Sequence, residues 1–512
     1  MRGSSRGRDF SRRVRVRQWR ALPQTIFFLL LAFGLLCAVP PARAADVTAG
    51  GQSGQNPGED GQSAQAINPG NGDPTESATA TGGSGACYSF DCAFGAAESG
   101  GLAYASAAGT AVGAAVTSVA QGGAGGGGAV GGAAGRGGDA TATGTLAFGG
   151  SLLVNATGGS GGLNYNNPGI GGNGGNASAT GTGSTGGTNG ASLSINANAL
   201  GGIAGTGVVY GQYGTATASA SGVGTGTQSV AVSASSAGSV ASGTTASATV
   251  SGSGNAYASA AQVSFNGGSS LNNAATGSTL GGTLDLEQDA GALGGGTASS
   301  TLSLTDTTSK IIIGNVLASS GDYTSVPLVI DGSASSSVSI EGSHTVTVSA
   351  MSYGSPVFAS ATAKSDGTAN TDSATATAKS QSDYGSLSNT ATAFATVAGN
   401  GTATASATQS SGVTADGTGG LSASLVNVVG GQTIGGTLTL NQTAQGGGGT
   451  NTGGDAISQL TYSELKSKTI TATTTALGGT GGGQAHSAID LTGSILSTQR
   501  QRRRAVQVHK LA

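Results

Sequence analysis

Small apolar and polar side chains alternate along most of the chain with a period of two. In residues 283–288 and 301–305, for example, Leu recurs at every second position. Successive side chains of a β-strand point to opposite faces, so this alternation predicts strands with one buried and one outward face. Helical spacing is almost absent, and the abundant Gly costs a helix interior about 1 kcal/mol per residue relative to Ala. We therefore expect an all-β fold.

Internal repeats indicate how these strands are joined. Repeated units recur at offsets of 37, 15 and 154 residues, and the third is gap-free and long enough to suggest duplication of a larger block. Stacked copies bury a narrow core that a single small-residue strand cannot bury alone. The sequence thus predicts a parallel β-helix or β-solenoid-like repeat stack. The repeats are 135–145 with 172–182, 361–364 with 376–379 and 391–394, and 270–295 with 424–449.

Glycine-rich stretches leave alternatives to the solenoid open. The spacing between alternating segments varies, and residues 121–138 and 446–454 are mostly glycine with other small residues. Such stretches carry few side chains to bury, so we expect Gly-rich disordered loops there. An irregular or sandwich-like β-stack and a mainly disordered chain remain the alternatives.

The first 44 residues are typical of a secretory signal peptide. Eight arginines lie between Arg2 and Arg20, an apolar run follows at 25–39, and Ala42-Arg43-Ala44 forms a small-x-small cleavage site. The apolar run is too short to span a bilayer comfortably. We expect cleavage after Ala44, export to the cell surface, the extracellular space or the periplasm, and no transmembrane span in the mature chain.

The charge of the exported part excludes some partners. Residues 45–499 contain 22 acidic and six basic side chains, a net charge of −16. Nucleic acid and anionic lipid both require a basic footprint, so neither is an expected partner of this stretch.

Composition divides the chain into six segments. The signal peptide is followed by a polar linker, a stretch of repeats, two copies of the longer block and a basic tail. These segments are 1–44, 45–99, 100–268, 269–422 (repeat block 1), 423–496 (partial repeat block 2) and 497–512.

Two cysteines, Cys87 and Cys92, remain after the expected cleavage. In an oxidising compartment we expect them to form a disulfide that closes a small local loop. Two free thiols are the alternative, and a metal site is less favoured because no His lies nearby.

The repetition is similar to that of a known class of surface protein. Residues 171–180, Gly-Gly-Asn-Gly-Gly-Asn-Ala-Ser-Ala-Thr, the Thr-Ala-Thr-Ala strands and the export signal resemble bacterial surface adhesin passengers of the filamentous-haemagglutinin and autotransporter type. The resemblance covers most of residues 100–490, without a translocator barrel. It implies a parallel β-helix and a role in attachment or in a surface layer. The Gly-rich blocks are also similar to mycobacterial PGRS-type proteins, without their PE domain.

Three alternating carboxylates form one candidate for metal binding. Asp285, Glu287 and Asp289 share one strand face, and oxygen-rich clusters can hold Ca²⁺. The duplicated block has Thr, Asn and Thr at the corresponding positions, 439, 441 and 443. We therefore expect a solvated acidic face and no metal.

No catalytic constellation or cofactor site is predicted. Ser463 and Lys466 match Ser-x-x-Lys without a companion motif. His344 and His486 lack Cys or acidic neighbours at ligand spacing and are expected to be surface residues.

Threonine-rich strands suggest a binding alternative. Ranked threonines on a flat face can order water or contact ice or polysaccharide, but the drifting coil length predicts poor ranking. The Thr-x-Thr segments lie at 141–143, 375–377, 390–392 and 402–404.

Together these features predict a secreted or cell-surface structural or adhesive repeat protein that is not an enzyme. Expected partners are a host or environmental surface, a polysaccharide or another copy of the chain. The alternatives are a glycan- or ice-binding solenoid and a disordered, Gly-rich matrix component. Regular threonine ranks with exposed aromatic residues on one face would favour the binding solenoid.

Overall fold

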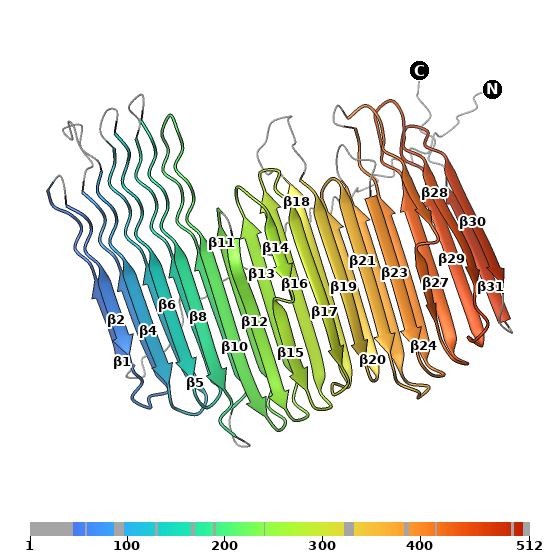
Figure 1. Ribbon diagram of the computed structural model, residues 1–512, viewed down its shortest axis with the longest axis horizontal. Coiled ribbons are helices and arrows are strands. Elements are labelled where there is room, and N and C mark those ends of the chain that lie inside the picture. Colours follow the sequence, from blue (N-terminus) through green and yellow to red (C-terminus); the bar gives the residue numbers. More distant parts are fainter. Residues whose placement is uncertain are drawn as a thin grey trace, which may run out of the picture. The chain divides into compact units, whose positions relative to one another are not determined.

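Parallel strands stacked coil upon coil build the computed structural model, and no helix occurs among the residues it describes (Figure 1). Each coil gives one strand to a long sheet and one strand, or two short ones, to the opposite side. This arrangement confirms the all-β, solenoid-like stack expected from the sequence. The described residues are 45–56, 59–86, 97–128, 132–164, 169–187, 191–239, 241–321, 332–382, 389–414, 417–492 and 496–504.

The long sheet has 15 strands, and each pairs in parallel with the next coil's strand. In spatial order they are β1 (Ala45–Gly50), β3 (Thr75–Thr81), β5 (Ala114–Gln121), β7 (Gly150–Thr157), β9 (Leu193–Leu200), β11 (Val230–Gly238), β13 (Ala256–Ser264), β16 (Thr283–Leu293), β18 (Ile311–Gly321), β20 (Thr345–Tyr353), β22 (Ser373–Gln381), β24 (Thr402–Ser410), β27 (Thr437–Gln445), β29 (Thr469–Leu477) and β31 (Leu496–Arg504).

Three short sheets form the opposite side of the stack. The N-terminal short sheet contains β2 (Ala64–Asn68), β4 (Ala103–Gly109), β6 (Ala140–Leu146), β8 (Ala177–Ser184), β10 (Ala216–Thr225), β12 (Ala241–Ser251) and β15 (Ala275–Thr279). The middle short sheet contains β14 (Ser269–Asn272), β17 (Ala298–Asp306), β19 (Ala334–Gly342), β21 (Val357–Ser365), β23 (Asn389–Val397) and β26 (Val429–Gln432). The C-terminal short sheet contains β25 (Ala423–Val426), β28 (Ala456–Ser463) and β30 (Ala485–Thr492).

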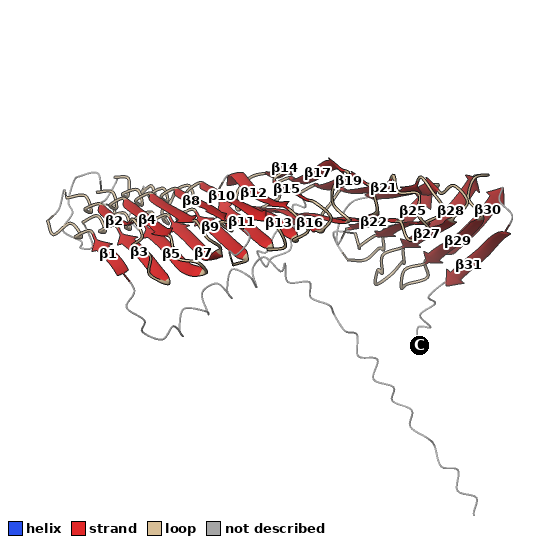
Figure 2. Ribbon diagram, turned by 90° about the horizontal axis from the view of Figure 1, so that it is seen from below, coloured by secondary structure: helices blue, strands red, loops and turns tan. Residues whose placement is uncertain are grey.

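The core lies between the long sheet and the short sheets, which form two layers in Figure 2. Every second side chain of most strands is buried, and most of these are alanines, with Leu284, Leu286, Ile312, Leu438 and Ile470 among the larger ones. One apolar cluster runs from Ala64 to Ile489. The period-two pattern therefore produces one long, thin core, and two small alanine-rich clusters, around Leu425 and around Ala298, are separate from it.

In the first five coils, glycine-rich segments extend both sides of the stack beyond the ends of the strands. Figure 1 shows these segments as the wavy traces above β2 to β10. In the clearest of them, 133–138, 158–164 and 171–175, two buried residues alternate with one exposed residue. This is the three-residue period of a polyproline II helix. We call these segments the glycine rows. One row contains 51–54, 82–86, 122–128, 158–164 and 201–206, and the other contains 59–63, 97–102, 133–139, 169–176 and 209–215.

Backbone hydrogen bonds join the two glycine rows. The N–H groups of Gly138, Gly159 and Gly175 donate in a zigzag to the carbonyl oxygens of Gly123, Gly138 and Gly159, each at 2.8 Å. A Cβ at any of the three donors would lie 1.9–2.0 Å from a carbonyl oxygen of the previous coil in the same row. The described parts of 121–138 that lie outside β5 thus form a hydrogen-bonded loop and not a disordered one, because neighbouring backbones satisfy their polar groups.

The duplicated block marks the two places where one short sheet ends and the next begins. In the first copy, β14 pairs forward with β17 while β15 pairs back with β12. In the second copy, β25 pairs forward with β28 while β26 pairs back with β23. The two copies of the block, 154 residues apart, therefore form the same break between short sheets.

Matching polar residues stabilise both breaks. Asn273 and Asn427 have φ values of 47° and 54°, in the left-handed region that Asn tolerates better than most residues. The buried Gln288 accepts the Ala275 N–H at 3.1 Å, and its counterpart Gln442 accepts the Val428 N–H at 3.3 Å. These side chains satisfy amides that the interrupted ladder leaves without a strand partner.

The structure changes two of the expected segment boundaries. Residues 45–99, expected as a polar linker, contribute β1, β2 and β3, so their described part belongs to the solenoid. The expected basic tail begins inside β31, which pairs with β29. The turn-forming Asn68-Pro69-Gly70 separates two strands too short for the alternation to stand out in the sequence. Residues 1–44, Cys87 and Cys92 lie outside the described residues.

We expect Gly138→Ala and Gly159→Ala each to destabilise the fold by about 1–3 kcal/mol, because the added methyl overpacks against a backbone oxygen that cannot move alone. Thermal denaturation of residues 45–512, followed by circular dichroism, measures this change. The outward Ser160→Ala is the control and should melt like the wild type. Glycine variants with an unchanged melting temperature would contradict the close packing of the rows.

Candidate functional site: a threonine array on the long sheet

Threonines dominate the outward positions of five consecutive strands of the long sheet, β20, β22, β24, β27 and β29. Their backbones pair without a register shift, so equivalent side chains line up across the strands. The central rank is Thr347, Thr375, Thr404, Thr439 and Thr471.

Two further ranks flank the central one. Each is displaced by two residues along the strands, and both contain only Ser, Thr or Asn. They are Thr345, Ser373, Thr402, Thr437 and Thr469 on one side, and Ser349, Thr377, Ser406, Asn441 and Thr473 on the other. We call these three ranks the threonine array.

The array has a fixed two-dimensional spacing. Strands of a sheet lie about 4.8 Å apart, and residues i and i+2 on one face lie about 6.6 Å apart. Threonine is stiff at χ1 because it is branched at Cβ, so its methyl and hydroxyl groups keep their places. Within the array Asn441 Nδ2 donates to Ser406 Oγ at 3.3 Å. The face is therefore a regular lattice of hydroxyl groups, with methyl groups at the threonines and an amide at Asn441.

This regular ranking corrects the expectation of poor alignment. Successive members of the central rank are separated by 28, 29, 35 and 32 residues along the chain, yet they remain in register. The turns take up the difference in coil length, outside the hydrogen-bonded ladder. Only the recurrence of Thr-x-Thr at one strand position could have indicated this from the sequence.

The array is almost uncharged. Among outward positions of its five strands, Lys379 carries the single charge, and its Nζ lies 5.5 Å from the centroid of the Tyr353 ring. Cation–π attraction holds that ammonium to one side. The three ranks thus offer hydroxyls and methyls without a charge of their own, while at one edge the next strand, β31, pairs Arg500 and Arg502 with Thr473 and Thr475.

The acidic strand β16 lies two strands before the array. Tyr257 Oη donates to Glu287 Oε2 at 2.8 Å, and Asp285 and Asp289 pair in register with Ile313 and Leu317 of β18. Burial raises the pKa of Asp289 to about 7 and also raises the pKa of Asp285. The negative charge of Glu287 is the second cause of both shifts. The face is therefore partly desolvated and not fully solvated as expected.

No group of three His, Cys, Asp or Glu side chains that could hold a metal ion occurs within the described part of the chain. A hollow of about 350 Å³ on the glycine rows is lined by glycine backbone with side chains such as Thr81, Gln121, Thr157 and Leu200. It contains no titratable side chain.

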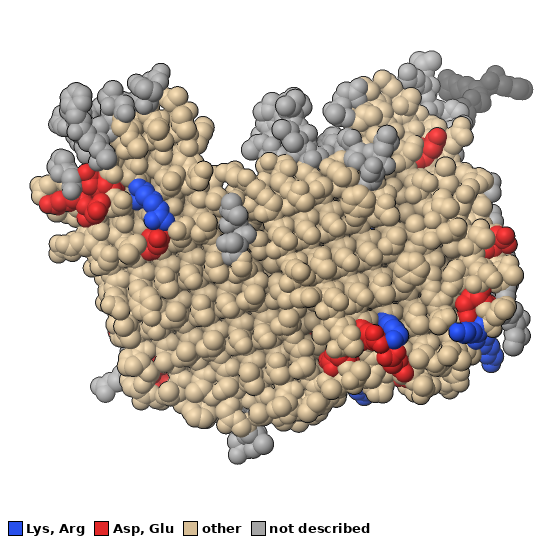
Figure 3. Space-filling model, viewed as in Figure 1, with Lys and Arg blue, Asp and Glu red and all other residues tan. Residues whose placement is uncertain are grey.

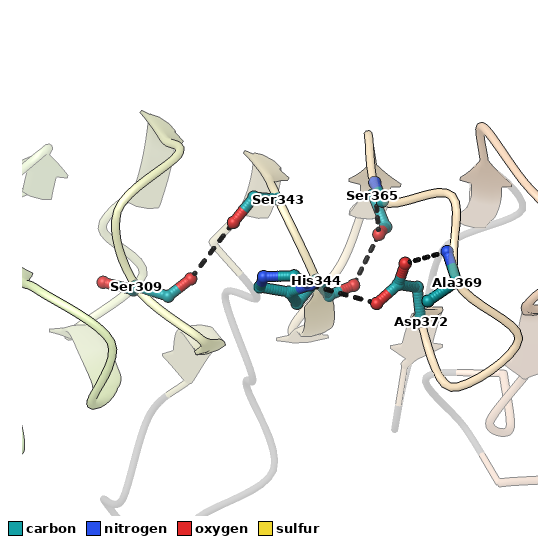
Figure 4. Close-up of polar contacts among 7 residues, drawn as sticks. Ser309, Ser343, His344, Ser365, Ala369 and Asp372 are labelled. Carbon is teal, nitrogen blue, oxygen red and sulfur yellow. Dashed lines mark hydrogen bonds and ion pairs between the residues drawn. The ribbon is translucent and has the colours of Figure 1, made fainter.

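The structure gives His344 an acidic partner that the sequence does not reveal (Figure 4). His344 Nδ1 lies 3.1 Å from Asp372 Oδ1, and Asp372 Oδ2 accepts the Ala369 N–H at 2.6 Å. The Asp372 side chain is 4% exposed and that of His344 is 55% exposed. The residues are 28 positions apart, which is one coil, so no local motif marks them.

The serines around this pair make other contacts. Ser365 Oγ donates to the His344 carbonyl oxygen and Ser343 Oγ to the Ser309 carbonyl oxygen, so neither hydroxyl bonds to the imidazole (Figure 4). A nucleophile bonded to the base, as acyl transfer requires, is not formed by these described residues. The pair joins the turn before β20 to the loop before β22.

The comparisons with known proteins add little to this geometry. No protein-family model and no curated protein matches the chain. Among solved structures, it is similar to a springtail antifreeze protein from Granisotoma rainieri, described as a nine polyproline type II helical bundle, at 22% identity. The match covers 32% of this chain and 90% of that chain with a TM-score of 0.12, too low to relate the two folds. Across the described residues, no helix long and apolar enough to cross a membrane is present.

We expect Asp289→Asn to flatten the pH dependence of stability. The raised pKa means that the folded state binds this proton more tightly than the unfolded chain, so wild-type stability falls as the pH rises from about 4 to about 7. The loss should be on the order of 1–3 kcal/mol, shared with Asp285. Urea denaturation at pH 4 and pH 8 measures it, with the exposed Asp490→Asn as control. Equal pH dependence of wild type and Asp289→Asn would contradict the desolvation of this carboxyl group.

Proposed function

We propose that this chain is an exported, non-catalytic solenoid that attaches to an extended, uncharged and regularly repeating surface. The single observation that supports this function is the threonine array, whose three ranks stay in register over five strands. A rigid repeating face meets a repeating surface with many equivalent contacts, and their effects combine although each is weak. The expected adhesive role is a function of this kind.

Charge also favours attachment to a neutral surface. Nucleic acid and anionic lipid bind through clustered Lys and Arg, whereas the array strands place only Lys379 outward. A neutral hydroxyl-rich surface requires no such charges, and Thr and Ser hydroxyls both donate and accept hydrogen bonds. The array therefore suits a surface of mixed donors and acceptors.

We expect the double variant Thr404→Tyr/Thr439→Tyr to lower attachment at least tenfold, because two bulky rings lift a flat surface away from the array. Retention of residues 45–512 on ice, on supported bilayers of zwitterionic lipid and on a neutral monolayer of terminal hydroxyl groups measures attachment. The matched control is Thr143→Tyr/Thr180→Tyr, a register pair on the opposite face. The proposal fails if the wild type is retained on none of these surfaces, or if the array variant is retained as well as the wild type.

Ice is a second candidate, favoured by one specific feature of the array. Its three ranks hold hydroxyl groups at fixed spacing, with methyl groups at the threonines and without aromatic or charged members, and such a face can order bound water in two dimensions. If ice is the surface, residues 45–512 should be incorporated into a slowly growing ice crystal and should slow its recrystallisation. The Thr404→Tyr/Thr439→Tyr variant should be excluded from the ice. Exclusion of the wild type would remove ice as a candidate while leaving other surfaces open.

A further inference from the structure

Two exposed phenylalanines occupy adjacent strands on the side opposite the threonine array. Phe358 in β21 and Phe394 in β23 are each 45% exposed, at positions where the neighbouring strands place mostly Ser and Thr outward. A phenyl ring left partly in water forgoes part of the hydrophobic free energy of complete burial. The two rings therefore form an aromatic surface among the mostly small, polar outward side chains of β19, β21 and β23.

Hydroxyl groups fill the space between the two rings. Phe358 pairs with Thr390, Thr362 pairs with Phe394, and between these pairs Thr392 Oγ1 donates to Ser360 Oγ at 3.2 Å. The rings are offset by four residues along the strands, about 13 Å, and by one strand. We call these six residues the Phe358–Phe394 platform.

The backbone beside Phe394 helps to hold its ring. Phe394 pairs with Gly430 of β26, and a Cβ at Gly430 would lie 2.8 Å from Phe394 Cε1. Glycine thus lets the ring lie close against the neighbouring strand. A ring fixed before binding loses little conformational freedom when a ligand stacks on it.

The surroundings of the platform are nearly neutral. On the face shown in Figure 3, charged side chains gather toward the rims and leave a wide uncharged area. On β19 and β21 the charged residues are Glu341 and Lys364, which pair with each other at 2.5 Å, and Lys364 also pairs with Asp366 at 3.0 Å. One lysine between two carboxylates leaves a net charge of −1, so the platform does not favour an anionic ligand.

We propose that the Phe358–Phe394 platform binds a neutral, linear polysaccharide. Sugar rings have an apolar C–H face that stacks on a phenyl ring and hydroxyl groups that bond to Ser and Thr. An extended chain can stack on both rings and place its intervening sugars over Ser360 and Thr392. This inference rests on the proposed attachment function but assigns a separate site, on the opposite face from the threonine array.

Affinity electrophoresis of residues 45–512 in gels containing a soluble neutral β-glucan tests the platform. We expect Phe358→Ala and Phe394→Ala each to weaken binding about fivefold and the double variant at least twentyfold. Phe358→Tyr/Phe394→Tyr should retain binding, because stacking needs only an aromatic ring. The matched control is Phe148→Ala, which removes a 39% exposed phenylalanine from a turn outside the platform. Thermal melts of every variant separate loss of binding from loss of fold.

Three results would overturn the inference: no wild-type binding to neutral glucan, unchanged binding by the double alanine variant, or equal retardation in a gel containing anionic alginate. Its failure can be told from failure of the proposed function. If Thr404→Tyr/Thr439→Tyr still abolishes attachment to a solid surface while neutral glucan is not bound, the array function stands and the platform alone is rejected.

Discussion

Backbone hydrogen bonding between neighbouring coils is the constraint on which the rest of this structure depends. Alanine is the main buried residue, and each buried methylene-sized group contributes only about 0.8 kcal/mol, so one coil buries too little to fold alone. The parallel ladder of the long sheet joins all the coils, and each is stabilised chiefly by its two neighbours. The same ladder sets the spacing of every surface residue. The register of the outward side chains therefore follows directly from the backbone hydrogen bonds that hold the coils together.

The architecture could be predicted from the sequence, but the arrangement of the outward side chains could not. Alternation with period two and the repeats predict an all-β stack, and the 270–295 and 424–449 copies form equivalent breaks in the short sheets. Coil length was misleading, because an interval of 28 residues and one of 35 both return the chain to the same rank of threonines. Turn length and ladder register are physically independent, so one cannot be inferred from the other.

Glycine content was misleading for a related reason. In isolation it indicates flexibility, since glycine has more conformational freedom to lose on folding than any other residue. In the glycine rows the absence of Cβ instead allows neighbouring backbones to approach and bond, as Gly138 does with Gly123. The period of three in 171–176 was the signal in the sequence, and composition alone hid it. His344 and Asp372 left no such signal, because only the stacking of two coils brings them together.

The two breaks between short sheets also have a consequence for how the number of coils can change by recombination. Each copy of the block carries its own asparagine at positive φ and its own buried glutamine, so each forms a self-contained joint. The long sheet passes both joints without interruption. Recombination between the two copies would add or remove the 154 residues between equivalent positions as whole coils. These residues include three of the five array strands and both platform phenylalanines, so the reach of the molecule and the number of its binding residues would change together, in discrete steps.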